Sequence, residues 1–545
     1  MVEVIGANSS QESIINFFFK RHGQVFSNFD CKVTISKSSA MTRETFSVEA
    51  SVQNKVLNIS LSVTDLHSVR WGLNAVNKWV KAGATEKLVL EDKPDFRWRG
   101  VVEGFYGNPW KHQQRLKGIE HFGDYGMNLY LIAPKDAQWQ RFQWRNPLND
   151  EFLAELAELI ARGNQNAVDV SACVSPGLSV TYSSEEDVPA VVNKFLQMAS
   201  VGATHFGLLL DDIPDTLTHE NDLAKYGNVA QAHADFANRV RAKLVEANPL
   251  AHVILCPMHY AGRGTEPYCL VMGDELHPQI DLMWTGREIC SGYLDIADAV
   301  VFDRSTRRPP FYWDNYPVND GSMATRLHIG PIDGREKGLH KYSAGLLANP
   351  MELFEASLIS LGTIGDYLWS TEKYAAYESW ERILVDLIPV EADRKATREF
   401  FRNTLGMTGH WSPEFNQTIG ACSTAWRNGE PAKAAAAARE AVTKIRNNSQ
   451  VIDADAYCAP LLRKEIAPWL EKYAKGADWL EGMAEVLDQC VAVQGEGLQG
   501  PKWGHQRLLD LRADLNSTTR KLFSDGFDIM LGELAGEINF IQSTT

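Results

Sequence analysis

The sequence lacks the segments that would attach it to a membrane or direct it for export. No apolar run among its 545 residues reaches the roughly 18 residues that a membrane span needs. The first ten residues, MVEVIGANSS, lack the basic and apolar blocks of a signal peptide. We therefore expect no membrane partner and a cytoplasmic location, unless a leader has been removed.

The sequence also lacks a cysteine framework and a basic cluster. Its eight cysteines (31, 173, 256, 269, 290, 422, 458 and 490) form no CxxC motif and no cluster with histidine. This scatter favours free thiols and predicts no metal site. With 54 basic against 69 acidic residues, the formal charge is −15. That surplus disfavours nucleic acid as a partner and favours a neutral substrate. The sequence leaves the oligomeric state open.

What is present indicates a globular chain with three regions of different texture. Hydrophobic residues make up 44% of the chain and charged residues 23%. The stretches 46–52 and 57–63 alternate like strands, and a helical pattern follows at 66–81. From about 370 onward the pattern is helical. We predict a small α+β domain at 1–95, a middle domain at 96–371 and a helical region at 372–545.

The middle domain alternates between short strand patterns and helical patterns. The helical patterns are clearest at 109–125, 151–161, 185–200, 229–247 and 351–361. The strand patterns lie at 100–104, 127–133, 168–174, 204–210, 252–257, 281–284, 310–313 and 342–347. Eight strands that alternate with helices predict an α/β fold, the (β/α)8 TIM barrel.

Polar side chains follow seven of these eight predicted strands. The residues in question are Glu103 with Gly104, Lys135 with Asp136, Asp211 with Asp212, His259 with Tyr260, Trp284 with Thr285, Trp313 with Asp314, Asn315 and Asp320, and Asn349. A barrel enzyme carries its active site at the carboxyl ends of its strands. The pattern therefore predicts one shared pocket.

Asp211 and Asp212 carry the chemistry in this prediction. They end the apolar run 206–210, so a buried strand delivers two adjacent carboxylates. Two neighbouring carboxylates repel each other when both are ionised, which predicts that one stays protonated and acts as a general acid. The run Asp211-Asp212-x-x-Asp215 also fits the DDxxD magnesium motif of terpene synthases. That motif sits on a helix and handles diphosphates, whereas here it follows a strand and no basic cluster is present.

The other candidates have simpler interpretations, which the sequence leaves open. Asn349 precedes a proline and a helical pattern, so it fits a helix cap. Gly104 fits a tight turn, and Lys135 fits a solvated loop. Trp313 and Tyr260 fit packing at the mouth of the barrel.

Seven motifs in order resemble glycoside hydrolase family 84, the O-GlcNAcase family. They lie at 99–110, 130–136, 210–213, 283–286, 313–320, 327–335 and 347–350. The resemblance implies a retaining β-N-acetylglucosaminidase whose substrate's own acetamido group is the nucleophile, an exception to the two-carboxylate rule.

The resemblance also implies a role for each matching residue. Asp211 orients the acetamido group, and Asp212 is the acid and base. The sugar is bound by Gly104, Lys135, Tyr260, Trp313, Asn315, Asp320 and Asn349. No metal or cofactor is implied. The expected substrates are terminal N-acetylglucosamine (GlcNAc) on a glycoprotein, glycopeptide or glycan, including GlcNAc on Ser or Thr.

Two other functions stay open at this stage. One is a hyaluronidase-like glycosidase that cuts within a polymer, which a pocket closed around O4 and O6 of the sugar disfavours. The other is a sugar-binding protein without turnover, which the intact Asp211 and Asp212 disfavour. The chitinase-type DxxDxDxE motif is absent from the sequence.

Overall fold

The computed structural model describes residues 2–38, 42–84, 87–404, 413–494, 497–523 and 526–540. The chain forms two compact units. The first comprises residues 1–318, 332–354 and 361–376, and the second comprises 319–331, 355–360 and 377–545. No helix in the described ranges is both long enough and apolar enough to cross a membrane.

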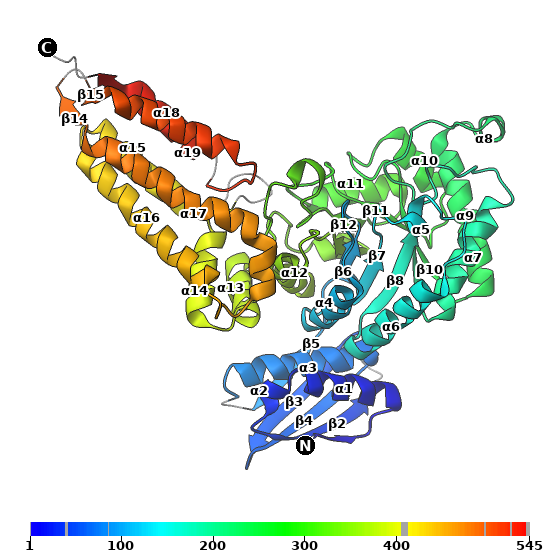
Figure 1. The fold of residues 1–545 in the computed structure, drawn as a ribbon. Helices are drawn as coiled ribbons and strands as arrows, with labels where there is room; N and C mark the ends of the chain where they lie inside the picture. Colours follow the sequence, from blue (N-terminus) through cyan, green and yellow to red (C-terminus); the bar gives the residue numbers. More distant parts are fainter. Residues whose placement is uncertain are drawn as a thin grey trace. The chain divides into compact units, whose positions relative to one another are not determined.

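The N-terminal part of the first unit is a five-stranded sheet covered by helices, as the alternating patterns predict. Its strands are β1 (Val2–Ile5), β2 (Asp30–Lys37), β3 (Phe46–Gln53), β4 (Val56–Val63) and β5 (Leu88–Asp92), in the order β1-β2-β4-β3-β5. The helices are α1 (Ser9–Arg21), α2 (Gly23–Phe26) and α3 (Leu66–Lys81). Phe18 of α1 and Leu73 of α3 are buried in one core with Ile59 of the sheet, and Figure 1 shows both helices along one face of the sheet.

The rest of the first unit is built on a closed barrel of eight strands, which confirms the predicted fold. The strands are β6 (Trp98–Glu103), β7 (Leu129–Ile132), β8 (Asp169–Val174), β9 (His205–Leu209), β10 (His252–Cys256), β11 (Asp281–Trp284), β12 (Phe311–Asp314) and β13 (Gly345–Ala348). Neighbouring strands are parallel, and β13 pairs with β6 to close the ring. Leu131, Ile254 and Leu347 pack in the interior, so the barrel is a filled core.

Helices follow the barrel strands and surround them (Figure 1). They are α4 (His112–Asp124), α5 (Gln138–Arg141), α6 (Asp150–Asn166), α7 (Asp187–Ser200), α8 (Glu220–Lys225), α9 (Val229–Ala247), α10 (Pro267–Glu275), α11 (Ile296–Thr306) and α12 (Phe354–Trp369), with the 3-10 turn η2 (Leu339–Tyr342). A further 3-10 turn, η1 (Gly321–Met323), belongs to the second unit. The short helix α5 lies in the loop that follows β7, and Lys135 precedes it in the same loop.

The second unit is mainly a bundle of helices, as predicted for the C-terminal region. Its helices are α13 (Ala376–Leu387), α14 (Glu391–Phe401), α15 (Pro413–Arg427), α16 (Pro431–Asp453), α17 (Pro460–Asp488), α18 (Lys502–Ser517) and α19 (Gly526–Glu537). The sequence showed few strand signals here, yet the region also holds a small sheet of β14 (Val491–Val493), β15 (Gly497–Gly500) and β16 (Ile538–Phe540). Strands of three or four residues are too short to show a period of two.

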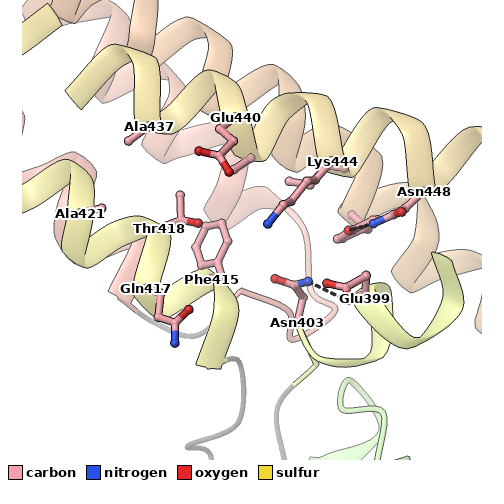
Figure 2. A pocket seen from close by; sticks show the side chains of 13 residues that line it. Glu399, Asn403, Phe415, Gln417, Thr418, Ala421, Ala437, Glu440, Lys444 and Asn448 are labelled. Carbon is pink, nitrogen blue, oxygen red and sulfur yellow. Dashed lines mark hydrogen bonds between the residues drawn. The ribbon is translucent and has the colours of Figure 1, made fainter. Parts of the chain in front are cut away.

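A hollow of about 290 Å³ lies between helices α14, α15, α16 and α17 of the second unit. Figure 2 shows Phe415 in its middle, with Glu440 and Lys444 of α16 on one wall and Asn403, which follows α14, on another. None of the residues that the sequence predicts for the active site lines it.

Candidate active site

The two adjacent aspartates after β9 occupy different surroundings. Asp211 is buried, with 4% of its surface exposed, whereas Asp212 is exposed. Asp212 has φ +52°, a left-handed backbone conformation that few residues other than glycine adopt. Because of this turn directly after a buried strand, the two carboxylates have separate partners.

Asp211 is paired with Lys135, which follows β7. The Lys135 ammonium donates to Asp211 Oδ2, and Lys135 is 3% exposed. Burial lowers the pKa of Lys135, but the charge of Asp211 raises it above its ordinary value. The lysine is therefore a charged group held inside the barrel end. This excludes the solvated-loop interpretation.

Asp212 accepts hydrogen bonds from two tyrosines. Tyr260 Oη donates to Oδ1 and Tyr106 Oη donates to Oδ2, both at 2.8 Å. Burial raises the pKa of Asp212, but the charge of Lys135 and the two tyrosine hydrogen bonds outweigh it, so the pKa lies below its ordinary value. This lowered pKa runs against the sequence-based prediction that repulsion between the neighbouring carboxylates keeps one of them protonated, as far as Asp212 is concerned.

A second network joins residues from three further strand ends. Trp313 Nε1 and Asn349 Nδ2 both donate to Asn315 Oδ1 at 2.9 Å. The Gly104 amide donates to Asn349 Oδ1 at 3.1 Å. The Asn315 amide donates to the Ile289 carbonyl oxygen at 2.8 Å, which ties the loop after β11 to the same network.

Lys135 joins the two networks, because its ammonium lies 5.3 Å from the centre of the Trp313 ring. Asn349 is not a helix cap, since α12 begins at Phe354 with Leu353 as its N-cap. A β-carbon on Gly104 would lie 2.2 Å from the Trp313 ring, so this glycine allows close contact with the ring. Trp313 does pack in the barrel core, but its indole N–H is also part of the polar network.

Comparison with known proteins decides the family. The β-N-acetylglucosaminidase family profile matches residues 99–402, which is more than half of the chain. The chain belongs to the β-N-acetylglucosaminidase family. It is therefore a glycoside hydrolase, and its resemblance to family 84 is confirmed.

Individual relatives agree with this assignment. The chain is 31% identical over 274 residues to Protein O-GlcNAcase of Rattus norvegicus and to that of Mus musculus. Each match covers 49% of this chain but only 29% of the relative. A Thermobaculum terrenum O-GlcNAc hydrolase variant has 29% identity and a TM-score of 0.74, over 81% of this chain and 95% of that one. CpGH84B has a TM-score of 0.80 at 22% identity, over 98% of this chain and 96% of that one, and so supports the fold alone.

One of the predicted site residues of this glycosidase lies in the other compact unit. Asp320 belongs to the stretch 319–331 of the second unit, where it precedes η1. The remaining eight lie in the first unit, and each of them contacts at least one of the other seven. Asp212 does so through Tyr260, and Asp211 through Lys135. A role for Asp320 in sugar binding stays a prediction.

Two other polar residues at the strand ends have structural partners. Glu103 is fully buried and accepts from Arg115 Nη2 at 2.7 Å, from the Trp110 amide at 3.1 Å and from the Tyr130 hydroxyl. Asp314 forms a buried ion pair with Arg335, in which Nη2 lies 2.6 Å from Oδ1. Both carboxylates therefore stabilise the carboxyl ends of their strands through ion pairs.

Sequence reasoning missed two residues that contact Asp212. Tyr106 lies in the motif at 99–110, but the sequence does not link its hydroxyl to Asp212. Arg141, at the end of α5, donates through Nη2 to the Asp212 carbonyl oxygen at 2.8 Å. A strand-end rule does not reach Arg141, because it lies six positions after Lys135 and at the end of a helix. Within the described residues, no group of three His, Cys, Asp or Glu is arranged to hold a metal ion.

Proposed function

We propose that the chain is a retaining exo-β-N-acetylglucosaminidase that removes terminal β-linked GlcNAc by substrate-assisted catalysis. The observation that carries the proposal is the division between Asp211 and Asp212. One carboxylate is buried against a lysine, and its neighbour is exposed and bonded to two tyrosine hydroxyls. Adjacent residues of one type therefore have environments suited to different tasks.

In the first step, the acetamido carbonyl oxygen of the sugar attacks C1 while the bond from C1 to the leaving oxygen breaks. Asp211 accepts a hydrogen bond from the acetamido N–H, which makes the carbonyl oxygen a better nucleophile. Asp212 gives its proton to the leaving oxygen. The products are a protonated oxazoline, whose N–H stays hydrogen-bonded to Asp211, and the free alcohol. This path needs no enzyme nucleophile and no cofactor.

In the second step, a water attacks C1 of the oxazoline and the ring C1–O bond breaks. Asp212, now a carboxylate, takes a proton from the water, and the acetamide is restored. Attack from opposite faces in the two steps retains the β configuration. The tyrosine hydroxyls that donate to Asp212 stabilise its ionised form, which suits the base role in this step.

The remaining residues are proposed to bind and orient the sugar. Trp313 and Asn315 enclose the acetamido group with Tyr260, which explains a preference over plain glucosides. Gly104 and Lys135 lie against the O3 side, and Asn349 with Asp320 holds O4 and O6. A sugar held at O4 and O6 favours removal of terminal residues over cutting within a polymer.

The proposed substrates include GlcNAc on Ser or Thr. This finer assignment is supported by the names of the relatives, which are a protein O-GlcNAcase in rat and mouse and an O-GlcNAc hydrolase in Thermobaculum terrenum. GlcNAc-bearing glycoproteins, glycopeptides and glycans are the partners that follow. The formal charge of −15 is compatible with these neutral sugars.

The test is hydrolysis of matched aryl glycosides. We expect turnover of the N-acetyl-β-glucosaminide, slower turnover of the galactosamine analogue and none of the β-glucoside. A GlcNAc-Ser peptide tests the finer assignment, and release of GlcNAc is the expected result. Binding of GlcNAc without turnover of any aryl glycoside contradicts the proposal and favours a sugar-binding protein. Internal cleavage of hyaluronan favours a hyaluronidase-like enzyme.

A further inference from the structure

Arg141 is a buried cation that is linked to Asp212 by one direct hydrogen bond and by a second path through Tyr106. Its Nη2 donates to the Asp212 carbonyl oxygen at 2.8 Å, and its Nη1 donates to the Tyr106 hydroxyl oxygen at 3.0 Å. That hydroxyl in turn donates to Asp212 Oδ2 at 2.8 Å. Arg141 thus reaches the main chain of Asp212 directly and its carboxylate through one tyrosine.

The surroundings of Arg141 do not indicate a residue kept for stability. It is 5% exposed, and its Nε has no hydrogen-bond partner. In the part of the chain that the structure describes, it forms no ion pair within 4.0 Å. A buried charge without an ion-pair partner costs stability. Such a residue is typical of a site where geometry matters more than stability.

Asp212 needs a stabilising contact from another residue, because its own backbone is in a disfavoured conformation. At φ +52° the β-carbon of Asp212 is crowded by the backbone, which has an energetic cost for any residue other than glycine. The cost is released if the Asp212 peptide rotates, and such a rotation moves the carboxylate. The guanidinium opposes this rotation by binding the carbonyl oxygen of the same residue.

Tyr106 also needs a fixed position, because 41% of its surface is exposed. The hydrogen bond from Arg141 Nη1 fixes the hydroxyl oxygen, which leaves the hydroxyl proton directed at Asp212. Arg141 therefore restrains both ends of one catalytic group.

We propose that Arg141 is a positioning residue that holds Asp212 in the orientation for proton transfer to the leaving oxygen. The inference rests on the proposed function, in which Asp212 is the general acid. Arg141 itself moves no proton. Because kcat/KM reports the first step, in which Asp212 is the acid, the effect of Arg141 on kcat/KM depends on how much the leaving group needs a proton.

The test compares Arg141→Met with wild type on two aryl N-acetyl-β-glucosaminides. Phenol is a poor leaving group that needs protonation, and 2,4-dinitrophenol is a good one that does not. The quantity is kcat/KM, which reports oxazoline formation. We expect a loss of about 100-fold for the phenyl glycoside and less than about 3-fold for the dinitrophenyl glycoside. Arg141→Lys, which keeps one donor, recovers part of the loss.

The matched control is Arg145→Met. Arg145 lies four positions after Arg141, but it pairs with Asp187 and does not contact Asp212. We expect Arg145→Met to leave the ratio between the two substrates unchanged. The unfolding midpoint of Arg141→Met is expected to equal or exceed that of wild type, since a buried unpaired charge is removed.

Three outcomes overturn the proposal. They are an equal loss on both glycosides, a loss that follows a lowered unfolding midpoint, and no loss at all. If Arg141→Met does not fold, Tyr106→Phe is measured instead, because it removes one of the two links between Arg141 and Asp212. We then expect a smaller loss in kcat/KM that is again greater for the phenyl than for the dinitrophenyl glycoside. Wild type that hydrolyses neither glycoside refutes the proposed function instead, so the two failures are distinguishable.

Discussion

Replacing Gly104 by alanine tests whether the Trp313 ring is held as closely as the structure shows. The added β-carbon would lie 2.2 Å from Cζ2 and 2.4 Å from Cη2 of Trp313. Ordinary contact begins near 3.4 Å, so the ring has to move by about 1.2 Å. The ring is 4% exposed and its Nε1 is bonded to Asn315 at 2.9 Å, so little room is left for this movement.

Both stability and activity should fall. Overpacking of this kind costs about 1–3 kcal/mol of unfolding free energy. A displacement near 1 Å in a sugar-orienting residue lowers kcat/KM on the order of 100-fold. The measurements are denaturant unfolding and hydrolysis of an aryl N-acetyl-β-glucosaminide. Gly420→Ala is the control, because nothing lies within 4 Å of its added β-carbon.

A double variant separates crowding from other effects. Trp313→Phe removes Cζ2 and Cη2, the two atoms that the new β-carbon meets. Gly104→Ala should therefore cost less stability in the Trp313→Phe background than in wild type, with a coupling of about 0.5–3 kcal/mol. Wild-type stability and kcat/KM in Gly104→Ala, or additive costs in the double variant, would refute the close contact.

Three further predictions concern the carboxylates. Lys135→Met should lower the free energy of unfolding, measured with denaturant, by about 3–5 kcal/mol, because Asp211 is left buried without its cation. If adding Asp211→Asn to this variant restores none of the lost free energy, the reasoning is contradicted. Asp212→Asn should slow the phenyl glycoside far more than the dinitrophenyl glycoside in kcat/KM, and equal losses would remove Asp212 from the acid role. In wild type, kcat/KM for the phenyl glycoside should fall as pH rises through the lowered pKa of Asp212. Tyr106→Phe removes a hydrogen bond that lowers this pKa, so the fall should move to higher pH in a pH–rate profile; an unmoved or downward-shifted profile contradicts the assignment.

Local patterns predicted the fold because the barrel strands are short buried runs that alternate with helical patterns. The predicted strand at 204–210 and the observed β9 (His205–Leu209) differ by one residue at each end. The strand-end rule then located Lys135, Asp211 and Asn349, since parallel strands bring their carboxyl ends to one side of a barrel.

Tertiary partners were beyond the reach of the sequence. Glu103 ends one buried strand and Lys135 follows another, yet Glu103 pairs with Arg115 while Lys135 contacts Asp211. Nothing in the local sequence separates these two cases, because the partners lie on other elements. The lowered pKa of Asp212 has the same origin, since Lys135 and Tyr260 are distant in sequence.

The central claim is that the substrate supplies its own nucleophile, and fluorination of the acetamido group tests it most directly. Each fluorine on the acetyl methyl withdraws electrons from the carbonyl oxygen but leaves C1 and the leaving group unchanged. For aryl glycosides with zero to three fluorines, we predict that kcat/KM falls steeply with each fluorine added. Rates that do not depend on fluorination would require an enzyme nucleophile, and would contradict the roles given to Asp211 and Asp212.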